Sequence, residues 1–500
     1  MVKKTLAFIA SVAAFRAVIA VELAAPFGEG MVLQRGMAVP IWGRAPTGSS
    51  VEVSFAGQVR SANADANGDW MVRLDPLDAS REGRVLEVVA HSSTEESRLA
   101  VPGILVGEVW LCSGQSNMAL QIFNTDGAYV GRHANQAMDM GYVEAMISRD
   151  SMVRLFKTPF EWSKEPRAQW KDPPKWIKVE PGSAVGFSAV GFQFAMALRQ
   201  ALDVPVGIVD ASWGNARVVG FVSREGFRAV PGLEKEAESV PDDFGPVGYL
   251  GKRYGYNQPC VIWNGRIRPL APMAFRGALW YQGEANIGDG AKNLLFLRAL
   301  WKGWSDAFRN PSLPFLVVQV APHDYGWKKD DPAWHFCDIW KAQSDFAKEI
   351  PCGGLVTTVD IGELRNIHPN GKRSVALRLV ANALGKVYGD TKIHWQSPEF
   401  ASATAGTNGT VRVVAANVGK WLLHGDMEAP FELAGEDGVF HDATPDFQPK
   451  GEVVLRADGV AKPVAVRYAW SWGRLAKLKN EYGFPLLPFN EKVDGEAENP

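Results

Sequence analysis

Four short motifs in this chain place reactive or hydrogen-bonding side chains directly after apolar, strand-like runs. The motifs are Gly114-Gln115-Ser116-Asn117, Ser212-Trp213-Gly214-Asn215, Gln282-Gly283-Glu284 and Asn366-Ile367-His368-Pro369. In an open α/β sheet, ligands bind outside the carboxyl ends of the strands. If the runs before these motifs belong to one parallel sheet, all four motifs lie at the same edge. We therefore expect one site that contains a serine, a histidine, an acid and several amides.

A serine and a neutral imidazole together provide what acyl transfer requires. The hydroxyl must lose its proton as it attacks, so an imidazole has to lie within hydrogen-bond reach. We predict Ser116 as the nucleophile and His368 as the general base. The oxyanion that develops needs preorganised donors. The backbone N–H groups of Ser116 and of the Gly214-Asn215 turn are candidates, with a side-chain amide as a third donor.

The elements that must position these residues fall into several domains, because 500 residues exceed one compact core. Residues 21–103 read as short β-strands with turns, and Asn67-Gly68 is a hairpin signal. Residues 104–390 alternate apolar runs with helical patterns, which indicates a parallel sheet covered on both faces. Residues 391–490 return to β character, and the tail 491–500 is expected to be disordered.

Helical periodicity is clearest in two stretches of the α/β segment. Residues 190–202 read as a helix, and residues 293–308 carry apolar side chains at steps of three and four. After the last strand-like run, one further helix face is marked by Val375, Leu379, Ala383 and Val387.

The N-terminus has the pattern of a secretory signal. Lys3 and Lys4 precede an apolar run, and cleavage is expected after Ala20. Arg16 interrupts the apolar stretch, which is therefore too short to span a membrane. We expect residues 1–20 to be a signal peptide, the mature chain not to insert into a membrane, and the location to be periplasmic or secreted.

The composition limits which classes of partner and cofactor we expect. The formal net charge is −2 with no long basic block, which argues against nucleic acid as a partner. The four cysteines fit no zinc motif, and the eight histidines show no HExxH. We expect no metal and no other cofactor. Three disulfide pairings are open, and the oligomeric state cannot be read from the sequence.

In this order, "GQSNM" (114–118), "SWGN" (212–215), "WYQGEAN" (280–286) and "NIHP" (366–369) resemble the sialate O-acetylesterase family of SGNH hydrolases. The resemblance runs from Pro26 to Phe489. It implies an α/β fold, with the SGNH-hydrolase parallel sheet flanked by helices and with N-terminal and C-terminal β-sandwich-like modules. The resemblance also implies a serine nucleophile and a histidine base, with an oxyanion hole. The residues of that hole would be Ser116, Gly214, Asn215 and Gln282.

The chain departs from the family pattern at two positions. Relatives usually carry Gly-Gly where this chain has Gly214-Asn215, and an asparagine disfavours a conformation reserved for glycine. Relatives commonly carry Asp two residues before the histidine, where this chain has Asn366. Asn366 remains a candidate for orienting His368, although a carboxylate better stabilises the imidazolium that forms beside a serine nucleophile.

Three acids could replace the missing aspartate: Glu284, Asp360 or Glu363. We favour Glu284, because it follows the end of a strand-like run and related acetylxylan-type esterases are similar in using the glutamate of their QGE motif. Asp360 lies inside a strand-like run, which favours a structural role. Glu363 is only five residues before His368, which favours a loop surface position.

Together these features predict an exported serine esterase that removes O-acetyl groups from carbohydrate. Sialic acid, hemicellulose and other glycans remain open as the sugar. The alternative is a non-catalytic glycan-binding protein derived from such an esterase, in which the two asparagine departures record lost activity. The segment 225–260, with Tyr249, Tyr254 and Tyr256, forms either a pocket wall that faces sugar or a packed surface loop. No stretch of the chain has the pattern of an amphipathic lid, which argues against a lipase.

Overall fold

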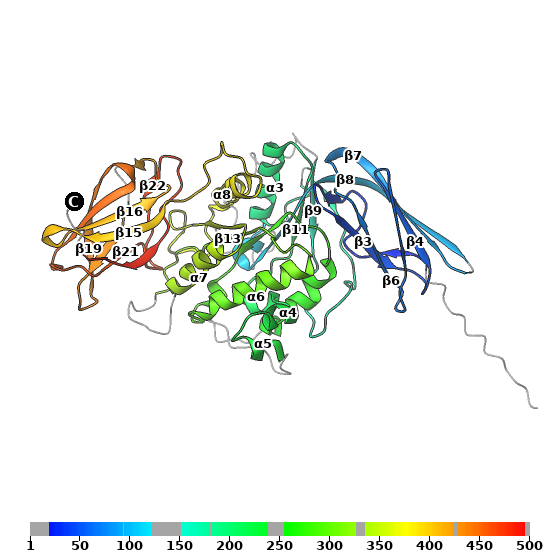
Figure 1. Cartoon of the computed structure of the whole chain (residues 1–500), viewed down its shortest axis with the longest axis horizontal. Helices are drawn as coiled ribbons and strands as arrows, with labels where there is room; N and C mark the ends of the chain where they lie inside the picture. The colour runs from blue at the N-terminus through cyan, green and yellow to red at the C-terminus, as the bar shows by residue number, and fades with distance from the viewer. Residues whose placement is uncertain are drawn as a thin grey trace, which may run out of the picture.

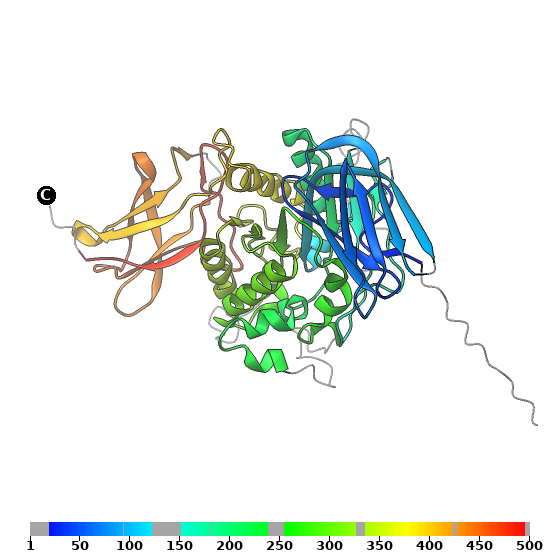
Figure 2. The same cartoon turned by 45° about the vertical axis from the view of Figure 1, so that its right-hand side comes forward.

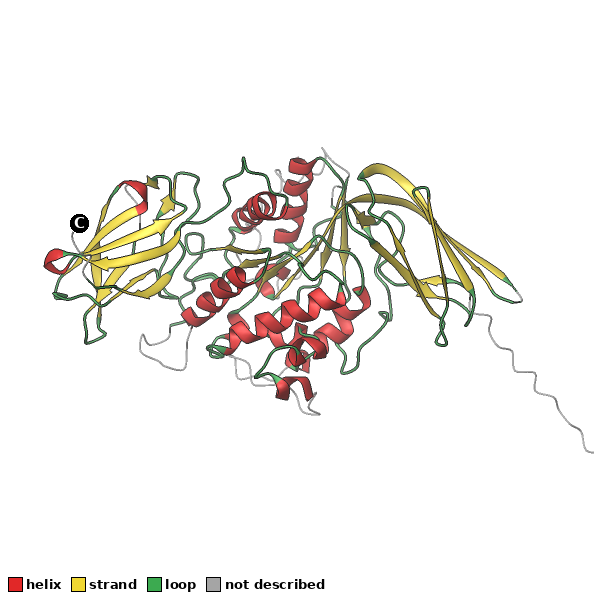
Figure 3. Cartoon of the chain, in the orientation of Figure 1, coloured by secondary structure: helices red, strands yellow, loops and turns green. Residues whose placement is uncertain are grey.

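The computed structural model describes residues 20–93, 95–122, 152–180, 182–238, 255–326, 336–423 and 428–495. The expected signal segment lies outside these residues except for Ala20. The described chain forms an N-terminal β module, a central α/β domain and a C-terminal β module along the long axis of the molecule (Figure 1). Nearly all of the helices lie in the central domain, and strands build both ends (Figure 3).

The N-terminal module consists of two facing sheets (Figure 2). One sheet contains β1 (Glu22–Leu23), β3 (Val39–Arg44) and β6 (Asp69–Leu74). The other contains β5 (Gln58–Asn63), β4 (Ser50–Phe55), β7 (Ser80–His91), the first half of β8 (Glu96–Gly114) and β2 (Val32–Gln34). Alternate residues of β4 are buried, so one face of the strand covers the core. The hairpin expected at Asn67-Gly68 is wrong, because β5 pairs with β4 and β6 pairs with β3. The turn instead carries the chain from one sheet to the other.

Strand β8 runs from the N-terminal module into the central domain and crosses the expected boundary at 103/104 without a break. Its first half pairs antiparallel with β7, and its second half pairs in parallel with β11 (Val206–Asp210) and β12 (Gly277–Tyr281). The two modules therefore share one continuous strand. At the junction, the carboxylate of Glu108 is wholly buried and accepts hydrogen bonds from Arg35 Nε (2.6 Å) and Arg276 Nε (2.8 Å).

Six parallel strands form the central sheet in the order β9-β11-β8-β12-β13-β14. The strands not yet described are β9 (Val153–Lys157), β13 (Phe315–Val318) and β14 (Gly353–Val356). A short strand, β10 (Ile177–Lys178), adds antiparallel to the outer edge of β9. Because the six strands run in one direction, their carboxyl ends lie at one edge of the sheet.

Helices cover both faces of this sheet. One face carries α3 (Ala189–Leu202) and α8 (Lys372–Asn382), and the other carries α4 (Arg224–Arg228) and α6 (Lys292–Ala307) (Figure 1). Further helices are α5 (Glu234–Glu238) and α7 (Phe336–Glu349). Successive residues of β8 alternate between the two cores: Trp110 and Cys112 pack with α3 and α8, whereas Val109 and Leu111 pack with α6. The helices expected at 190–202 and 293–308 are confirmed, and α8 continues into a π-helical turn, η7 (Ala383–Val387).

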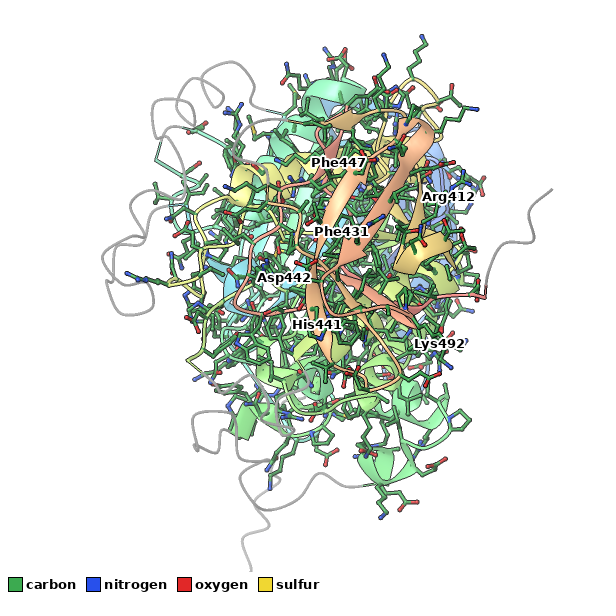
Figure 4. The ribbon with its side chains drawn as sticks, turned by 90° about the vertical axis from the view of Figure 1, so that its left-hand side faces the viewer. Arg412, Phe431, His441, Asp442, Phe447 and Lys492 are labelled. Carbon is green, nitrogen blue, oxygen red and sulfur yellow. The ribbon has the colours of Figure 1, made fainter. Side chains whose placement is uncertain are left out.

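The C-terminal module is one antiparallel sheet, which faces the viewer in Figure 4. Its strands, in spatial order, are β15 (Glu399–Ala405), β16 (Val411–Ala416), β20 (Glu452–Ala457), β19 (Phe440–Phe447), β18 (Phe431–Ala434), β21 (Ala465–Tyr468) and β23 (Phe489–Lys492). The N–H group of Ala405 donates to Asp494 O (3.0 Å), so the chain beyond the last strand meets the first one. A separate ribbon pairs β17 (Trp421–Leu422) with β22 (Lys479–Asn480).

The C-terminal tail begins later than expected. Residues 491 and 492 belong to β23 and pair with β21, so the expectation of disorder from Glu491 onward is wrong at its start. The polar side chains there are exposed while the backbone is hydrogen-bonded, which explains why the sequence reads as a tail. Residues 496–500 lie outside the described residues.

Two further questions raised by the sequence are membrane insertion and disulfide pairing. No helix in the described ranges has the length and apolar character needed to cross a membrane. All four cysteines are free thiols, and burial raises the pKa of Cys260 to about 12.

Candidate active site

The four motifs follow the carboxyl ends of four strands of the central sheet, as the sequence predicts. The strands β8, β11, β12 and β14 lead into the motifs that contain Ser116, Gly214-Asn215, Glu284 and His368, respectively. Backbone hydrogen bonds join neighbouring motifs. The N–H group of Gln115 donates to Tyr281 O (3.0 Å), and that of Trp213 donates to Gly114 O (2.8 Å).

Ser116 begins a short helix, α1 (Ser116–Ala119), directly after β8. Gly114 permits this turn, because its φ is +133° and a Cβ there would lie 2.1 Å from Tyr281 O. The side chain of Gln115 fixes the adjacent loop, since its Oε1 accepts from the N–H groups of Gly283 (3.3 Å) and Ala285 (3.1 Å). Ser116 is half-buried.

Asn117 joins the serine loop to the histidine loop. Its Nδ2 donates to Ile367 O (3.0 Å) and to Glu284 Oε1 (2.6 Å). The residue after Ser116 is thus bonded to the residue before His368, which brings together two segments that lie far apart in the sequence. Within the described residues, the Ser116 hydroxyl and the His368 imidazole share no direct hydrogen bond in this structure.

Lys372 is a site residue that the sequence analysis missed. It is the first residue of α8, is only 1% exposed, and donates from Nζ to Asn117 Oδ1 (2.7 Å) and Pro369 O (2.8 Å). Burial lowers the pKa of Lys372 to about 7, although the charge of Glu284 acts in the opposite direction. In the sequence, a lysine followed by an arginine at a helix start reads as an exposed residue, so no local signal identifies it.

His368 is held in a neutral state at pH 7. Burial, followed by the positive charges of Lys372 and His323, lowers the pKa of His368 to about 4. A neutral imidazole is the form that can accept a proton from a hydroxyl.

Asn366 holds the backbone of His368 and not its ring. Its Oδ1 accepts from the His368 N–H (3.1 Å), while its Nδ2 donates to His368 O (2.9 Å) and to Glu363 Oε2 (3.0 Å). The first contact is an Asx turn, in which an asparagine side chain bonds the backbone two residues on. Asn366 therefore orients His368 by fixing the loop, and it uses both its donor and its acceptor.

None of the three candidate acids hydrogen-bonds the His368 ring within the described residues. Glu284 is 2% exposed, and burial raises the pKa of its carboxyl. Its carboxylate accepts a hydrogen bond from the side chain of Asn117, which lies between Glu284 and the histidine loop. Asp360 forms buried ion pairs with Arg378 (2.7 Å) and Lys479 (2.8 Å), and Glu363 binds Asn366 and Asn370.

The expected oxyanion-hole residues differ in whether their N–H groups are available to donate a hydrogen bond. Asn215 has φ +58°, in the left-handed region that asparagine tolerates, so the departure from Gly-Gly does not prevent the turn. Within the described chain, the backbone N–H groups of Ser116, Gly214 and Asn215 have no hydrogen-bond partner. By contrast, Gln282 Nε2 donates to Ala216 O (3.2 Å) and to Asn286 Oδ1 (2.5 Å). Both of its amide hydrogens are used, so Gln282 braces the turn instead of offering a free donor.

Of the three tyrosines in the segment expected to form either a pocket wall or a packed surface loop, Tyr256 is described and packs against Trp213, with ring centroids 5.4 Å apart. Tyr249 and Tyr254 lie outside the described residues. Among the residues that the structure describes, no group of His, Cys, Asp and Glu side chains could hold a metal ion.

Acetylesterases are among the relatives found by sequence and by structure. The chain is 30% identical to the sialate O-acetylesterase of Homo sapiens over 398 residues, which covers 74% of this chain and 71% of that protein. It is also 30% identical to the sialate O-acetylesterase of Rattus norvegicus, which covers 74% of each chain. The crystal structure of a carbohydrate acetylesterase from Xanthomonas citri superposes with a TM-score of 0.79 at 30% identity and covers 94% of this chain and 99% of that one. No family model matches the chain.

Proposed function

Since this chain belongs to the sialate O-acetylesterase family and is a carboxylic ester hydrolase, we propose that it removes O-acetyl groups from carbohydrate through an acetyl-enzyme on Ser116. His368 acts as the general base. The observation that carries this proposal is the hydrogen bond from Asn117 to Ile367 O, which holds the serine and histidine loops side by side.

The reaction proceeds in two halves. Ser116 Oγ attacks the acetyl carbonyl carbon and gives its proton to His368. The tetrahedral intermediate collapses, the bond between the acetyl carbon and the sugar oxygen breaks, and that oxygen takes the proton from His368. A water molecule then attacks the acetyl-enzyme with His368 again accepting a proton. Acetate leaves, and the proton returns to Ser116 Oγ.

Backbone N–H groups stabilise the oxyanion in this proposal. Those of Ser116, Gly214 and Asn215 are the available donors, and Gln282 supports them by bracing the turn. Losing one such donor typically costs about 3 kcal/mol of transition-state stabilisation.

In this proposal Glu284 does not contact His368 and acts on the site indirectly, through Asn117. It accepts from Asn117 Nδ2, and Asn117 Oδ1 accepts from Lys372. Through Asn117, this buried chain of hydrogen bonds fixes the segment that carries the nucleophile. Ser116 and His368 therefore work as a dyad, with Glu284 and Lys372 as positioning residues.

The order of the motifs and the parallel sheet that presents them support an SGNH-hydrolase fold for the central domain. Residues 1–20 support export to the periplasm or secretion, because they combine two lysines, an apolar run and a small residue at the expected cut.

The test is acetate release from a panel of O-acetylated sialic acids and acetylated hemicelluloses, together with hydrolysis of an aryl acetate. We expect Ser116→Ala and His368→Ala each to lower kcat by at least about 10³-fold. Asn370→Ala serves as a control in the same loop. Full activity of Ser116→Ala would refute the acetyl-enzyme, and no activity in any form of the protein would favour the glycan-binding alternative.

A further inference from the structure

Three aromatic side chains, which we call the aromatic platform, pack against one another beside the candidate site. The ring centroids of Phe160 and Trp213 lie 5.3 Å apart, and those of Trp213 and Tyr256 lie 5.4 Å apart. Phe160 is 56% exposed, and the other two are half-buried. Leaving this much apolar ring surface in water is unfavourable, so a ligand that covers the exposed part of Phe160 would gain binding free energy.

The platform lies on the opposite side of Ser116 from His368. Phe160 follows β9 and Trp213 follows β11, whereas the histidine loop follows β14. Strand β8, which leads to Ser116, lies between these two groups in the sheet. Trp213 also immediately precedes Gly214-Asn215, so the platform adjoins the proposed oxyanion donors.

A buried guanidinium supports the platform from below. Arg266 is 0% exposed, and its Cζ lies 4.1 Å from the centroid of the Phe160 ring. Because Arg266 is wholly buried, it occupies the inward face of the ring and leaves the outward face to solvent. Arg266 belongs to a π-helical turn, η4 (Trp263–Ile267), a feature that is frequent at functional sites.

Burying the Arg266 guanidinium lowers the stability of the folded protein. None of the three guanidinium nitrogens of Arg266 has a hydrogen-bond partner in the described part of the chain. Burial lowers the pKa of Arg266 to about 10, and the nearby negative charge of Asp210 opposes that shift. A desolvated cation without hydrogen bonds is strongly unfavourable, and the charge of Asp210 and the contact with the aromatic face both compensate for part of this cost.

We propose that the aromatic platform binds a sugar ring of the acetylated carbohydrate while the acetyl group lies at Ser116. This inference rests on the proposed esterase function. The C–H face of a pyranose is apolar and packs on aromatic rings, while its hydroxyl groups need polar partners at the rim. Tyr256 Oη and Asn215 Nδ2, which lie 3.4 Å apart, provide such partners.

The charges around the platform favour sugars that carry a carboxylate. Lys157 Nζ lies 5.6 Å from the centroid of Phe160, so a second cation lies near this ring in addition to Arg266. The positive potential attracts an acidic sugar in addition to the stacking that any pyranose can make. The experiment therefore compares a neutral and an acidic sugar.

The test measures kcat/KM of wild type and Phe160→Ala for an aryl acetate, an acetylated xylo-oligosaccharide and an O-acetylated sialic acid. The quantity of interest is the ratio of the sugar ester to the aryl acetate, because the aryl acetate has no sugar ring. We expect Phe160→Ala to lower this ratio about fivefold or more for at least one sugar, with the change in KM. Tyr482→Ala, an exposed aromatic of the C-terminal module, is the matched control and should leave the ratio unchanged.

A folded Phe160→Ala protein with the wild-type ratio for both sugars would overturn the inference. A direct binding measurement separates this outcome from failure of the esterase mechanism. Xylohexaose, which carries no acetyl group, is titrated into Ser116→Ala with and without Phe160→Ala. We expect weaker binding in the double variant, and equal binding would again overturn the inference. Activity that survives in Ser116→Ala would refute the acetyl-enzyme alone.

Discussion

The side chain of Asn117 donates a hydrogen bond of 3.0 Å to the backbone carbonyl of Ile367, and this contact joins the loops of Ser116 and His368. The same amide lies between a buried carboxylate and a buried ammonium, those of Glu284 and Lys372. Asparagine suits this place because it offers both donors and an acceptor. The geometry of the candidate site therefore depends on a polar core below it.

The Glu284–Asn117–Lys372 chain predicts that the two charged residues act as a unit. We expect Glu284→Gln and Lys372→Met each to lower kcat by roughly tenfold or more, because each leaves the other charge buried without its counter-charge. The double variant should lose less than the product of the two single effects. Multiplicative effects in this double-mutant cycle would instead favour Glu284 acting directly on His368.

The depressed pKa of His368 predicts an unusually acidic limit of activity. Since the folded-state pKa is about 4, neutral imidazole persists well below pH 6.5, and kcat/KM for an aryl acetate should fall only near pH 4. In the unfolded chain His368 binds a proton near pH 6.5, whereas in the folded protein it does so only near pH 4. Protonation of His368 therefore lowers the free energy of unfolding as the pH drops from about 6.5 to about 4. Circular dichroism across the same range separates unfolding from titration.

A variant sharpens the pH measurement. Lys372→Met removes one of the positive charges that lower the pKa of His368, so the acid limb should move to higher pH. A wild-type limb near pH 6.5, or a limb that does not move in Lys372→Met, would contradict this account of the histidine.

Asn366→Asp tests whether the usual family residue would serve better at this position. We expect kcat to fall about tenfold, because aspartate cannot make the two bonds that Asn366 Nδ2 donates and would place its carboxylate beside Glu363. Each lost bond contributes about 1 kcal/mol to holding the loop. Asn370→Asp, which loses only one long side-chain bond to Glu363 (3.4 Å), is the comparison and should lower kcat less. Higher turnover in Asn366→Asp would show that His368 lacks a carboxylate partner and can accept one there.

The sequence predicts the placement of the four motifs because parallel strands share one polarity, and residues after their ends must meet at one edge. Helix positions also follow, since their periodicity is local. Lys372 could not be found in this way, because its burial depends on contacts with segments more than 80 residues away, such as Asn117 and Glu284. The hairpin at Asn67-Gly68 fails for a related reason: a turn signal does not specify which strands pair.

The buried Glu108 predicts a large stability cost at the junction between the N-terminal module and the central domain. Glu108→Gln leaves Arg35 and Arg276 without their shared counter-charge. Removing one partner of a buried pair typically costs 3–5 kcal/mol, and about 3 kcal/mol is expected here because both arginines can turn toward water. Urea unfolding measures the change. Glu96→Gln, which removes an exposed pair with Arg98, should alter stability little. Equal effects of the two variants would refute the prediction that Glu108 stabilises the junction.

The C-terminal module contacts the segment that leads to His368, which predicts that it contributes to catalysis. Lys479 of β22 donates to the buried Asp360 (2.8 Å), and the N–H group of Ala476 donates to Val359 O (3.1 Å). We expect Lys479→Met to lower kcat by roughly threefold to tenfold with little change in KM, since Arg378 still holds Asp360 and the loop is loosened, not lost. The accompanying loss of stability should be about 1–2 kcal/mol.

The measurement is steady-state kinetics at a temperature well below the unfolding transition, where a purely structural role would leave kcat unchanged. Lys477→Met is the matched control, because Lys477 lies on the same segment and, among the described residues, its ion pair is with the exposed Glu428 (3.6 Å). An unchanged kcat in Lys479→Met, or an equal fall in both variants, would refute the proposed link. A selective fall in kcat would mean that the C-terminal module positions the histidine loop, because Lys479 itself lies outside the candidate active site.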